Sequence, residues 1–422
     1  MISFLISALK IIFLLGFLIL IHEAGHFFVA KLFKVKVHEF AIGFGPKILA
    51  KQGKETKYEL RLIPLGGFVR LEGEETRSED KRAFNNASIP KRMAIVAAGG
   101  AVNIVFGILV YFIIMFAIGN NVSTVVDSTV DNFAAEQYGI YSGDKIEKIN
   151  GKNINTKADI DEILKKSNGE EITIQLERNN EEKEIKLTPT KKEIKSTGIY
   201  VASNANGKNA TQVVQVDKNS AAEKAGIKAN DIIIKFNNEE IEGKADKLIQ
   251  AIQNCKENKV EVEIIRDGEN FTTNIELDLI PTYYLGINFK LAENNFTNNV
   301  YYAFFKTGDF LGSILENLKM LFTGKVGIDQ MMGPVGISSV VSQTTGIADF
   351  LYMLAIISIS LGFTNLLPIP ALDGGKLLIL LIEAIRRKPM KEELEIGIQM
   401  VGFIILISLS IFISYKDILR IF

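Results

Sequence analysis

Four long apolar stretches constrain the fold of this chain more than any other feature of its 422 residues. They cover residues 11–30, 93–118, 350–367 and 398–414. A helix needs about 20 apolar residues, at a rise of about 1.5 Å per residue, to cross the hydrocarbon core of a bilayer. Each stretch is close to that length, so the sequence predicts a polytopic α-helical membrane protein with about four transmembrane helices.

The alternatives are a cleaved signal peptide for the first stretch and buried core helices of a soluble protein for the last two. A signal peptide ends at a small-residue cleavage site. Here the apolar run continues instead through His22 and Glu23 into Phe27 and Phe28. The last two runs are long for core helices, so four membrane spans explain the pattern better.

Basic residues beside the spans predict the orientation of the chain, because cytoplasmic loops are enriched in Lys and Arg. Residues 31–92 hold 14 Lys and Arg against 8 Asp and Glu, whereas residues 119–300 hold 23 against 30. We expect residues 31–92 and the link at 376–397 to face the cytoplasm, and residues 119–300 and both termini to face outward. The net charge of the whole chain, −1, gives no reason to expect nucleic acid as a partner.

The polar middle of the chain contains an internal repeat with a constant offset of 87 residues. The matching pairs are Ala134 and Ala221, Gly139 and Gly226, Asp144 and Asp231, Ile146 and Ile233, Asn150 and Asn237, and Ile154 and Ile241. Alternating strands at 171–177 and 259–265 follow an amphipathic helix in both copies. The repeat predicts two copies of one small α+β domain, at 119–204 and 205–290.

The turn region of each copy resembles the signature of bacterial PDZ domains. The match runs from Gly139 to Gly151 in the first copy (GIYSGDKIEKING) and, more loosely, from Gly226 to Asn238 in the second. PDZ domains usually accept an extended peptide by strand addition. The resemblance therefore implies two inserted PDZ-like domains, which either bind a peptide ligand or serve as spacers or size filters.

Two of the three histidines in the chain, His22 and His26, lie one helical turn apart, with Glu23 beside the first. Residues at this spacing share a helix face, and two imidazoles there can bind one Zn²⁺ at about 2.0–2.1 Å. A neighbouring carboxylate acts as general base on metal-bound water. A hydrogen-bonded pair of core histidines is the alternative, but ionisable groups inside a membrane span are costly and rarely lack a function.

A catalytic zinc site usually has three protein ligands. The third histidine, His38, follows the end of the first span, and the single cysteine, Cys255, lies in the polar middle. Asp373 is the best remaining candidate, because it lies at the end of a span in the segment 365–375 (NLLPIPALDGG), where two prolines break the helix before it and two glycines follow it. Non-helical backbone at membrane depth is tolerated where it is buried in protein or lines a polar cavity.

These motifs resemble the site-2 proteases, and within them the bacterial zinc proteases that cleave anti-sigma factors in the membrane. HEAGH matches the family pattern H-E-x-x-H, and residues 365–374 match N-x-x-P-x-x-x-x-D-G. Residues 41–46 (AIGFGP) and 64–69 (PLGGFV) resemble the membrane-associated β-hairpin region of the family, which meets substrate. Residues 331–337 (MMGPVGI) resemble its G-P-[IV]-G stretch.

The resemblance implies intramembrane proteolysis at a Zn²⁺ ion held by His22, His26 and Asp373. Glu23 would move the proton of the attacking water to the leaving amine. The implied partners are the lipid bilayer and single-span membrane proteins, such as anti-sigma factors or signal-peptide remnants, in the bacterial cytoplasmic membrane. An edge strand from residues 35–72 is expected to unwind the substrate helix by strand addition.

Two asparagines are expected from the same resemblance to position substrate. Asn365 begins the motif that ends at Asp373, and it is expected to orient the substrate backbone or to stabilise an oxyanion. Asn103 occupies the place of the asparagine in the family pattern G-P-x-x-N, although Gly100 replaces the proline here.

The expected organisation has five parts: an N-terminal membrane part with the HEAGH helix (1–118), PDZ-like domains 1 and 2 (119–204 and 205–290), an amphipathic surface helix with a linker (291–345), and a C-terminal membrane part with the LDGG motif (346–422). The amphipathic helix, predicted at 304–322, either lies on the outer membrane surface or covers the second domain.

Two other classes of function compete with the protease. A metal transporter or sensor would use the same intramembrane ligands, but a pure binding site needs no general base such as Glu23. A catalytically silent scaffold would present the PDZ pair to partners, but it would not need a complete set of zinc ligands.

Overall fold

The computed structural model describes residues 2–74, 76–119, 121–201, 211–241, 243–324, 331, 333–342, 344 and 346–421. The chain divides into two compact units. One is formed by residues 1–114 and 310–419, and the other mainly by residues 115–309. The first unit carries the apolar helices and the second the repeated domains, so each unit is treated by itself.

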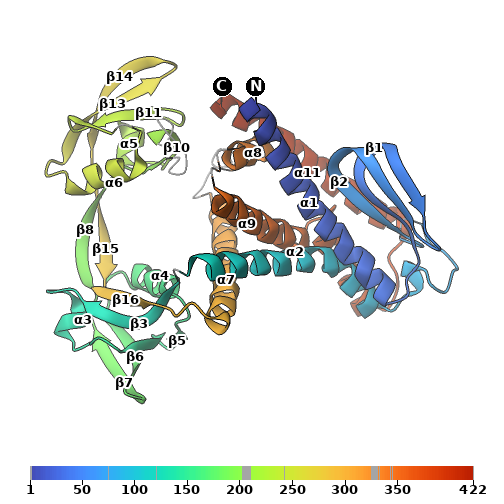
Figure 1. Cartoon of the computed structure of the whole chain (residues 1–422), viewed down its shortest axis with the longest axis horizontal. Coiled ribbons are helices and arrows are strands. Elements are labelled where there is room, and N and C mark those ends of the chain that lie inside the picture. Colours follow the sequence, from blue (N-terminus) through green and yellow to red (C-terminus); the bar gives the residue numbers. More distant parts are fainter. Residues whose placement is uncertain are drawn as a thin grey trace. The chain divides into compact units, whose positions relative to one another are not determined.

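Among the residues that the structure describes, four helices are long and apolar enough to cross a membrane, as the sequence predicts. They are α1 (Ile2–Leu32), α2 (Ile89–Ile118), α9 (Ile347–Leu366) and α11 (Glu392–Ile421). Large apolar side chains such as Phe116, Ile404 and Phe403 are exposed on them, as expected of helices that face lipid. In Figure 1 they are the long ribbons coloured blue, teal and orange to red.

Three further helices follow the repeated region: α7 (Phe296–Phe322), α8 (Pro334–Ser342) and α10 (Asp373–Arg386). The described part of the MMGPVGI segment includes the beginning of α8; its Met332 lies outside the described residues. Asp417, near the end of α11, accepts hydrogen bonds from the backbone amides of Gly333 (2.9 Å) and Gly336 (2.8 Å). This carboxylate satisfies amides that the first turn of a helix leaves without partners.

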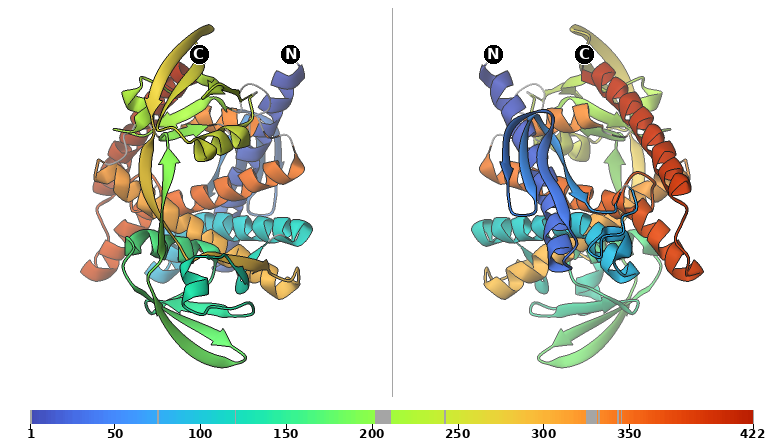
Figure 2. Two further views of the ribbon diagram at one scale, coloured as in Figure 1. Left: turned by 90° about the vertical axis from the view of Figure 1, so that its left-hand side faces the viewer. Right: turned by 90° about the vertical axis from the view of Figure 1, so that its right-hand side faces the viewer.

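Two long antiparallel strands, β1 (Val37–Gln52) and β2 (Lys57–Leu71), form the predicted β-region. Glu39 lies opposite both Arg70 and Lys57, so the first half of β1 has a neighbour on each side. The segments at 47–52 and 67–71 therefore form the two edges of the sheet. β2 packs along α1 (Figure 2).

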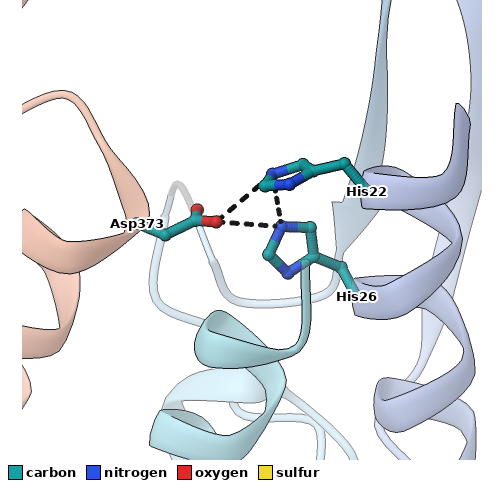
Figure 3. A group of neighbouring side chains, drawn as sticks. All are labelled: His22, His26 and Asp373. Carbon is teal, nitrogen blue, oxygen red and sulfur yellow. Dashed lines mark hydrogen bonds and ion pairs between the residues drawn. The ribbon is translucent and has the colours of Figure 1, made fainter. Parts of the chain in front are cut away.

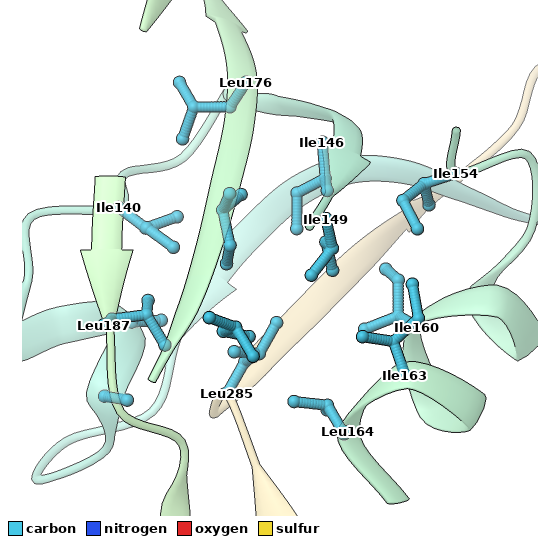
Figure 4. Close-up of a cluster of buried hydrophobic side chains, with 14 of the residues drawn as sticks. Ile140, Ile146, Ile149, Ile154, Ile160, Ile163, Leu164, Leu176, Leu187 and Leu285 are labelled. Carbon is cyan, nitrogen blue, oxygen red and sulfur yellow. The ribbon is translucent and has the colours of Figure 1, made fainter. Parts of the chain in front are cut away.

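The first copy of the repeat is a sheet with the strand order β16-β3-β4-β6-β7, and β5 pairs with β4. Its elements are β3 (Val122–Thr129), α3 (Ala134–Gln137), β4 (Lys145–Ile149), β5 (Lys152–Asn153), α4 (Lys157–Ser167), β6 (Ile172–Arg178), β7 (Glu181–Leu187) and β16 (Ile287–Leu291). Figure 4 shows its core, where Ile146, Ile149 and Leu176 of the sheet face Ile160 and Leu164 of α4. The alternation of apolar residues predicted these buried positions.

The second copy has the strand order β12-β11-β13-β14 and a separate pair of strands, β9 and β10. Its elements are β9 (Ile199–Val201), β10 (Val213–Val216), α5 (Ala221–Lys224), β11 (Ile232–Phe236), β12 (Glu239–Glu240), α6 (Ala245–Asn254), β13 (Lys259–Arg266) and β14 (Glu269–Glu276). Two paired strands, β8 (Thr190–Ser196) and β15 (Asp278–Tyr284), connect the copies.

Equivalent ion pairs in the two copies support the repeat. Arg178 binds the buried Asp144 at 2.7 Å, and Arg266 binds the buried Asp231 at 2.7 Å. The expected division after residue 204 lies outside the described residues. The strand β16, which the sequence placed at the end of the second copy, pairs with β3 and so completes the sheet of the first.

Candidate metal centre

Three side chains from two helices meet in the first unit (Figure 3). His22 and His26 project from α1 and Asp373 from the first residue of α10. Oδ2 of Asp373 lies 3.2 Å from Nε2 of His22 and 3.3 Å from Nε2 of His26. The two Nε2 atoms lie 3.2 Å apart. The structure therefore brings together the three residues that the sequence predicted as ligands.

The triangle of ligand atoms fits a zinc ion. Tetrahedral Zn²⁺ with bonds of about 2.0–2.1 Å holds neighbouring ligand atoms about 3.3–3.4 Å apart. Oδ2 of Asp373 is buried and accepts no well-aligned hydrogen bond within the described part of the chain. A buried carboxylate without such a bond is costly unless a cation compensates its charge. Two imidazoles and one carboxylate are a known ligand set of catalytic zinc.

Hydrogen bonds behind the two rings fix their orientation. Nδ1 of His26 lies 2.8 Å from the backbone oxygen of Ile95 on α2. Only a protonated Nδ1 can donate to that oxygen, so Nε2 keeps its lone pair for a metal. Nδ1 of His22 lies 3.5 Å from the side-chain amide of Asn365. Asn365 therefore lies behind a ligand ring, on the side turned away from the triangle.

A glycine on α2 makes room for both rings. A Cβ added at Gly99 would lie 2.4 Å from Nε2 of His26 and 2.7 Å from Cε1 of His22. Gly25 of α1 approaches α2 equally closely, because its Cβ would lie 2.6 Å from the backbone oxygen of Ala98. No larger residue fits at Gly99 without moving the rings.

Glu23 is half-buried beside the triangle and faces the β-region. A Cβ added at Gly67 would lie 3.2 Å from Cγ of Glu23 and 2.9 Å from the backbone oxygen of Ala41. The edge segment of β2 that begins at Gly67 therefore passes directly beside the predicted general base.

A cavity of about 940 Å³ adjoins Asp373 and is lined by residues of α2, α10 and α11 and of the segment after β2. Ion pairs lie in its wall. Lys376 binds Glu74 at 2.8 Å, and Arg92 binds Glu383 at 3.0 Å. Asp373, the predicted third ligand, therefore shares this cavity with four charged side chains that form ion pairs.

Asn103 takes no part in the triangle. Its side chain is completely buried, and neither its amide nitrogen nor its oxygen has a hydrogen-bond partner among the residues described. It follows Gly99 by one turn on the same helix face. Gly100 is packed so closely that an added Cβ would lie 2.7 Å from the backbone oxygen of Gly362 on α9.

Sequence reasoning did not predict the roles of Gly99 and Gln399. Gly99 belongs to a glycine pair within an apolar helix, and close helix packing in membranes favours such small residues. Gln399 is a polar residue in an apolar span and lines the cavity beside Asp373. A side-chain amide within a largely apolar span is the signal that points to it.

Two imidazoles and a carboxylate at tetrahedral spacing, with a glutamate beside them and membrane-length helices to carry them, define a membrane metalloprotease. The chain belongs to peptidase family M50, whose family model matches residues 10–409. This is the site-2 protease family that the sequence motifs resemble.

Known relatives support the same assignment over the full length of the chain. The chain is 31% identical over 463 residues to the regulator of sigma-E protease RseP of Escherichia coli, covering 100% of both chains. It is 29% identical over 455 residues to the regulator of sigma-W protease RasP of Bacillus subtilis, covering 99% of this chain and 100% of RasP. A candidate zinc metalloprotease of Clostridium acetobutylicum is 31% identical over 405 residues, 96% of this chain and 94% of that protein. The predicted enzyme class and cofactor are confirmed: the protein is a zinc metalloprotease.

Proposed function

We propose that this protease cleaves peptide bonds within the transmembrane segments of single-span membrane proteins. The observation that carries the proposal is the position of His22, Glu23 and His26 on α1, within a 24-residue segment long and apolar enough to span a membrane. A peptide bond must reach α1 to contact the metal. A substrate segment that lies inside the bilayer can do so without leaving the bilayer.

Each side chain of the centre has a distinct task in this reaction. When bound, Zn²⁺ acts as a Lewis acid and lowers the pKa of water. His22, His26 and Asp373 hold the ion, and the backbone oxygen of Ile95 holds the His26 ring in place at 2.8 Å. Glu23 accepts the proton of the attacking water and passes it to the leaving amine.

The edge of β2 is suited to receive the substrate. A helical substrate hides its carbonyl groups in hydrogen bonds within the helix. Residues 67–71 pair with β1 on one side only, so their other side offers backbone groups for strand addition. Because Gly67 lies beside Glu23, a strand added here would present its peptide bonds next to the general base.

The two asparagines differ in their support for a role in substrate positioning. Asn365 lies 3.5 Å from Nδ1 of His22, so we propose that it orients this ligand ring and, through it, the reacting groups. For Asn103 the support is its unpaired amide within the buried helix interface. A substrate backbone that entered between the helices would provide the missing partner.

The names of the relatives suggest the substrate class. Two relatives are named regulator of sigma-E protease RseP and regulator of sigma-W protease RasP, and we propose an anti-sigma factor or a signal-peptide remnant as the substrate of this chain. The charge bias of the loops supports an orientation with the repeated domains outside the cytoplasmic membrane and the metal centre toward its inner side. The exposed apolar residues Phe304, Leu315 and Phe322 suit α7 to the outer membrane surface.

The first repeated domain has a groove suited to a peptide. A cavity of about 670 Å³ lies between α4 and residues 280–289 and is lined by apolar side chains, among them Ile160, Leu164, Ile287 and Phe289. We propose that this PDZ-like domain binds an extended peptide there. The alternative, a size filter that excludes bulky substrates, predicts no saturable binding of short peptides.

Replacing Glu23 tests the proteolytic mechanism. Glu23→Gln keeps the shape of the side chain but cannot accept a proton. The variant should bind one zinc per chain and fail to cleave a co-expressed single-span substrate, whereas the exposed acid in Glu79→Gln serves as a matched control that should still cleave. Persistent cleavage by the Glu23 variant would refute the role of Glu23 as the general base.

Labelling tests the proposed orientation. The single cysteine, Cys255, is half-buried in the second copy, and its neighbour Lys256 is exposed. A Lys256→Cys variant in a Cys255→Ser background should react with a membrane-impermeant maleimide on intact spheroplasts. Reaction only after the membrane is permeabilised would reverse the orientation.

A further inference from the structure

The segment before the third ligand contains a strained residue. Ala371, two positions before Asp373, has φ = +73°, in the left-handed region that side chains with a Cβ rarely adopt. Such a conformation persists only where surrounding contacts impose it. The contacts of Ala371 therefore identify what holds the ligand loop in shape.

The contact that holds Ala371 comes from the last membrane span. The backbone N–H of Ala371 donates to Oε1 of Gln399 on α11, at 2.5 Å. Because the donor is a backbone amide, the oxygen of the glutamine must face it. Within the largely apolar stretch 398–414, this side chain has a polar partner at the ligand loop.

Two glycines close the same loop from both sides. Gly402 lies three residues after Gln399, on the same face of α11, and its added Cβ would lie 2.4 Å from Cβ of Pro370. Gly375 of α10 approaches from the other side, because its added Cβ would lie 2.4 Å from the backbone oxygen of Ile369. The loop thus packs closely against both α10 and α11.

The conformation of Ala371 sets the direction of Asp373. Asp373 is the first residue of α10 and directly follows Leu372. The backbone just before the helix therefore determines where the carboxylate of Asp373 lies. A change of φ at Ala371 from the left-handed to the ordinary region would rotate that backbone. Oδ2 of Asp373 would then no longer lie within 3.2 to 3.3 Å of both histidine nitrogens.

We propose that Gln399 is a positioning residue for the zinc ligand Asp373. It holds Ala371 in the left-handed conformation and thereby couples the placement of the fourth span to the geometry of the metal centre. The inference rests on the proposed role of His22, His26 and Asp373 as zinc ligands. In this proposal α11 contributes no ligand among the described residues but influences the zinc affinity of the centre.

Paired substitutions separate this role from general packing. Gln399→Met keeps the length of the side chain and removes the acceptor, and should weaken zinc binding by about 10- to 100-fold, as for other groups that orient ligands. Ala371→Gly adopts a positive φ without strain. The double variant should therefore regain most of the zinc affinity that Gln399→Met loses.

The measurement is zinc retained by the full-length protein in detergent, in competition with a chromophoric chelator. Gly397→Ala on the same helix is the matched control, because nothing lies within 4 Å of its added Cβ. Native zinc affinity in Gln399→Met, or loss that Ala371→Gly does not restore, would overturn the proposal.

A second pair decides the question if Gln399→Met does not fold. Ala371→Val raises the free energy of the left-handed conformation at this position while leaving Gln399 intact, and Ala371→Gly lowers it. The valine variant should bind zinc at least 10-fold more weakly than the glycine variant; equal affinities would refute the role of this conformation. The proposed function is judged separately, by zinc in the native protein and by Glu23→Gln.

Discussion

Gly99 of α2 lies directly against the ring of His26, and a Cβ built on Gly99 would stand 2.4 Å from Nε2, the ring nitrogen that faces Asp373. The backbone of α2 therefore forms one wall of the metal centre. The same helix supplies the oxygen of Ile95 that holds the other ring nitrogen at 2.8 Å. α2 contributes no ligand to the triangle, but it sets the position of one.

Replacing Gly99 with alanine should displace the ligand rings. In an ordinary helix interior this change is favourable by about 1 kcal/mol, but here the methyl group must push His26 or α1 away. We expect zinc affinity to fall by about 10- to 100-fold. Zinc content after dialysis against a chelator measures the effect, with Gly397→Ala as a control that should keep its zinc; unchanged zinc in Gly99→Ala would contradict the close packing.

Asn365 should act on zinc binding through His22. A ligating His22 carries its proton on Nδ1, so the carbonyl oxygen of Asn365 is expected to face that nitrogen, since amide orientation follows the hydrogen-bond network. Asn365→Leu should weaken zinc binding about 10-fold, and Asn365→Asp, which keeps an acceptor, should weaken it less. If Asn365→Leu changed only KM for substrate and left zinc affinity intact, the residue would act on substrate alone.

Arg178 should be essential for the stability of the first repeated domain. Burial raises the pKa of Asp144, but the Arg178 guanidinium and the backbone amide of Tyr141 outweigh it and hold that pKa below its usual range. Arg178→Met leaves a buried charge without its partner, which costs about 3–5 kcal/mol. Hydrogen exchange of the full-length protein should show faster exchange in β6 and β7. Peptides around Arg266 in the second copy provide the internal control, and equal acceleration there would point to global unfolding instead.

Stability should fall in acid through Glu55, which joins the end of α1 to the β-region. Glu55 binds Lys31 at 2.5 Å and Arg82 at 2.7 Å, and these hydrogen bonds lower its pKa from 4.5 to about 2. Because the pKa is lower in the folded state, the stabilisation is complete above the unfolded value of 4.5 and is lost as the pH falls toward 2.

Melting curves of the detergent-solubilised protein between pH 6 and pH 3 measure this contribution. The unfolding temperatures of the native protein and of Glu55→Gln should differ most at pH 6 and converge toward pH 3. A difference that stays constant over this range would exclude titration of Glu55 as its cause.

Local sequence patterns predicted much of this molecule. Hydropathy over about 20 residues predicted the four long helices. The constant offset between copies predicted two similar folds with Asp144 and Asp231 at equivalent positions, where the structure shows equivalent ion pairs. The spacing of His22 and His26 placed both rings on one face of α1. Each of these features depends on residues close in sequence or on a repeat, so no tertiary information was needed.

Other features depend on what packs against a residue. Nothing in the order of the strands predicted that β16 would pair with β3, because this pairing joins opposite ends of the polar middle. The motif around Asp373 indicated a candidate ligand but not the atoms that orient its carboxylate. The unpaired amide of Asn103 also became visible only when its surroundings were known.

The sequence by itself determined that this chain has membrane-length helices, a repeated polar middle and a histidine pair at metal spacing, since helix period and hydropathy are local properties. Only the tertiary structure decided that Asp373 lies within 3.2 to 3.3 Å of both histidines. It also revealed that Gly99 and Gln399 shape the centre. The role of such a glycine or glutamine depends on the groups that pack against it, and those contacts form only when helices distant in sequence come together.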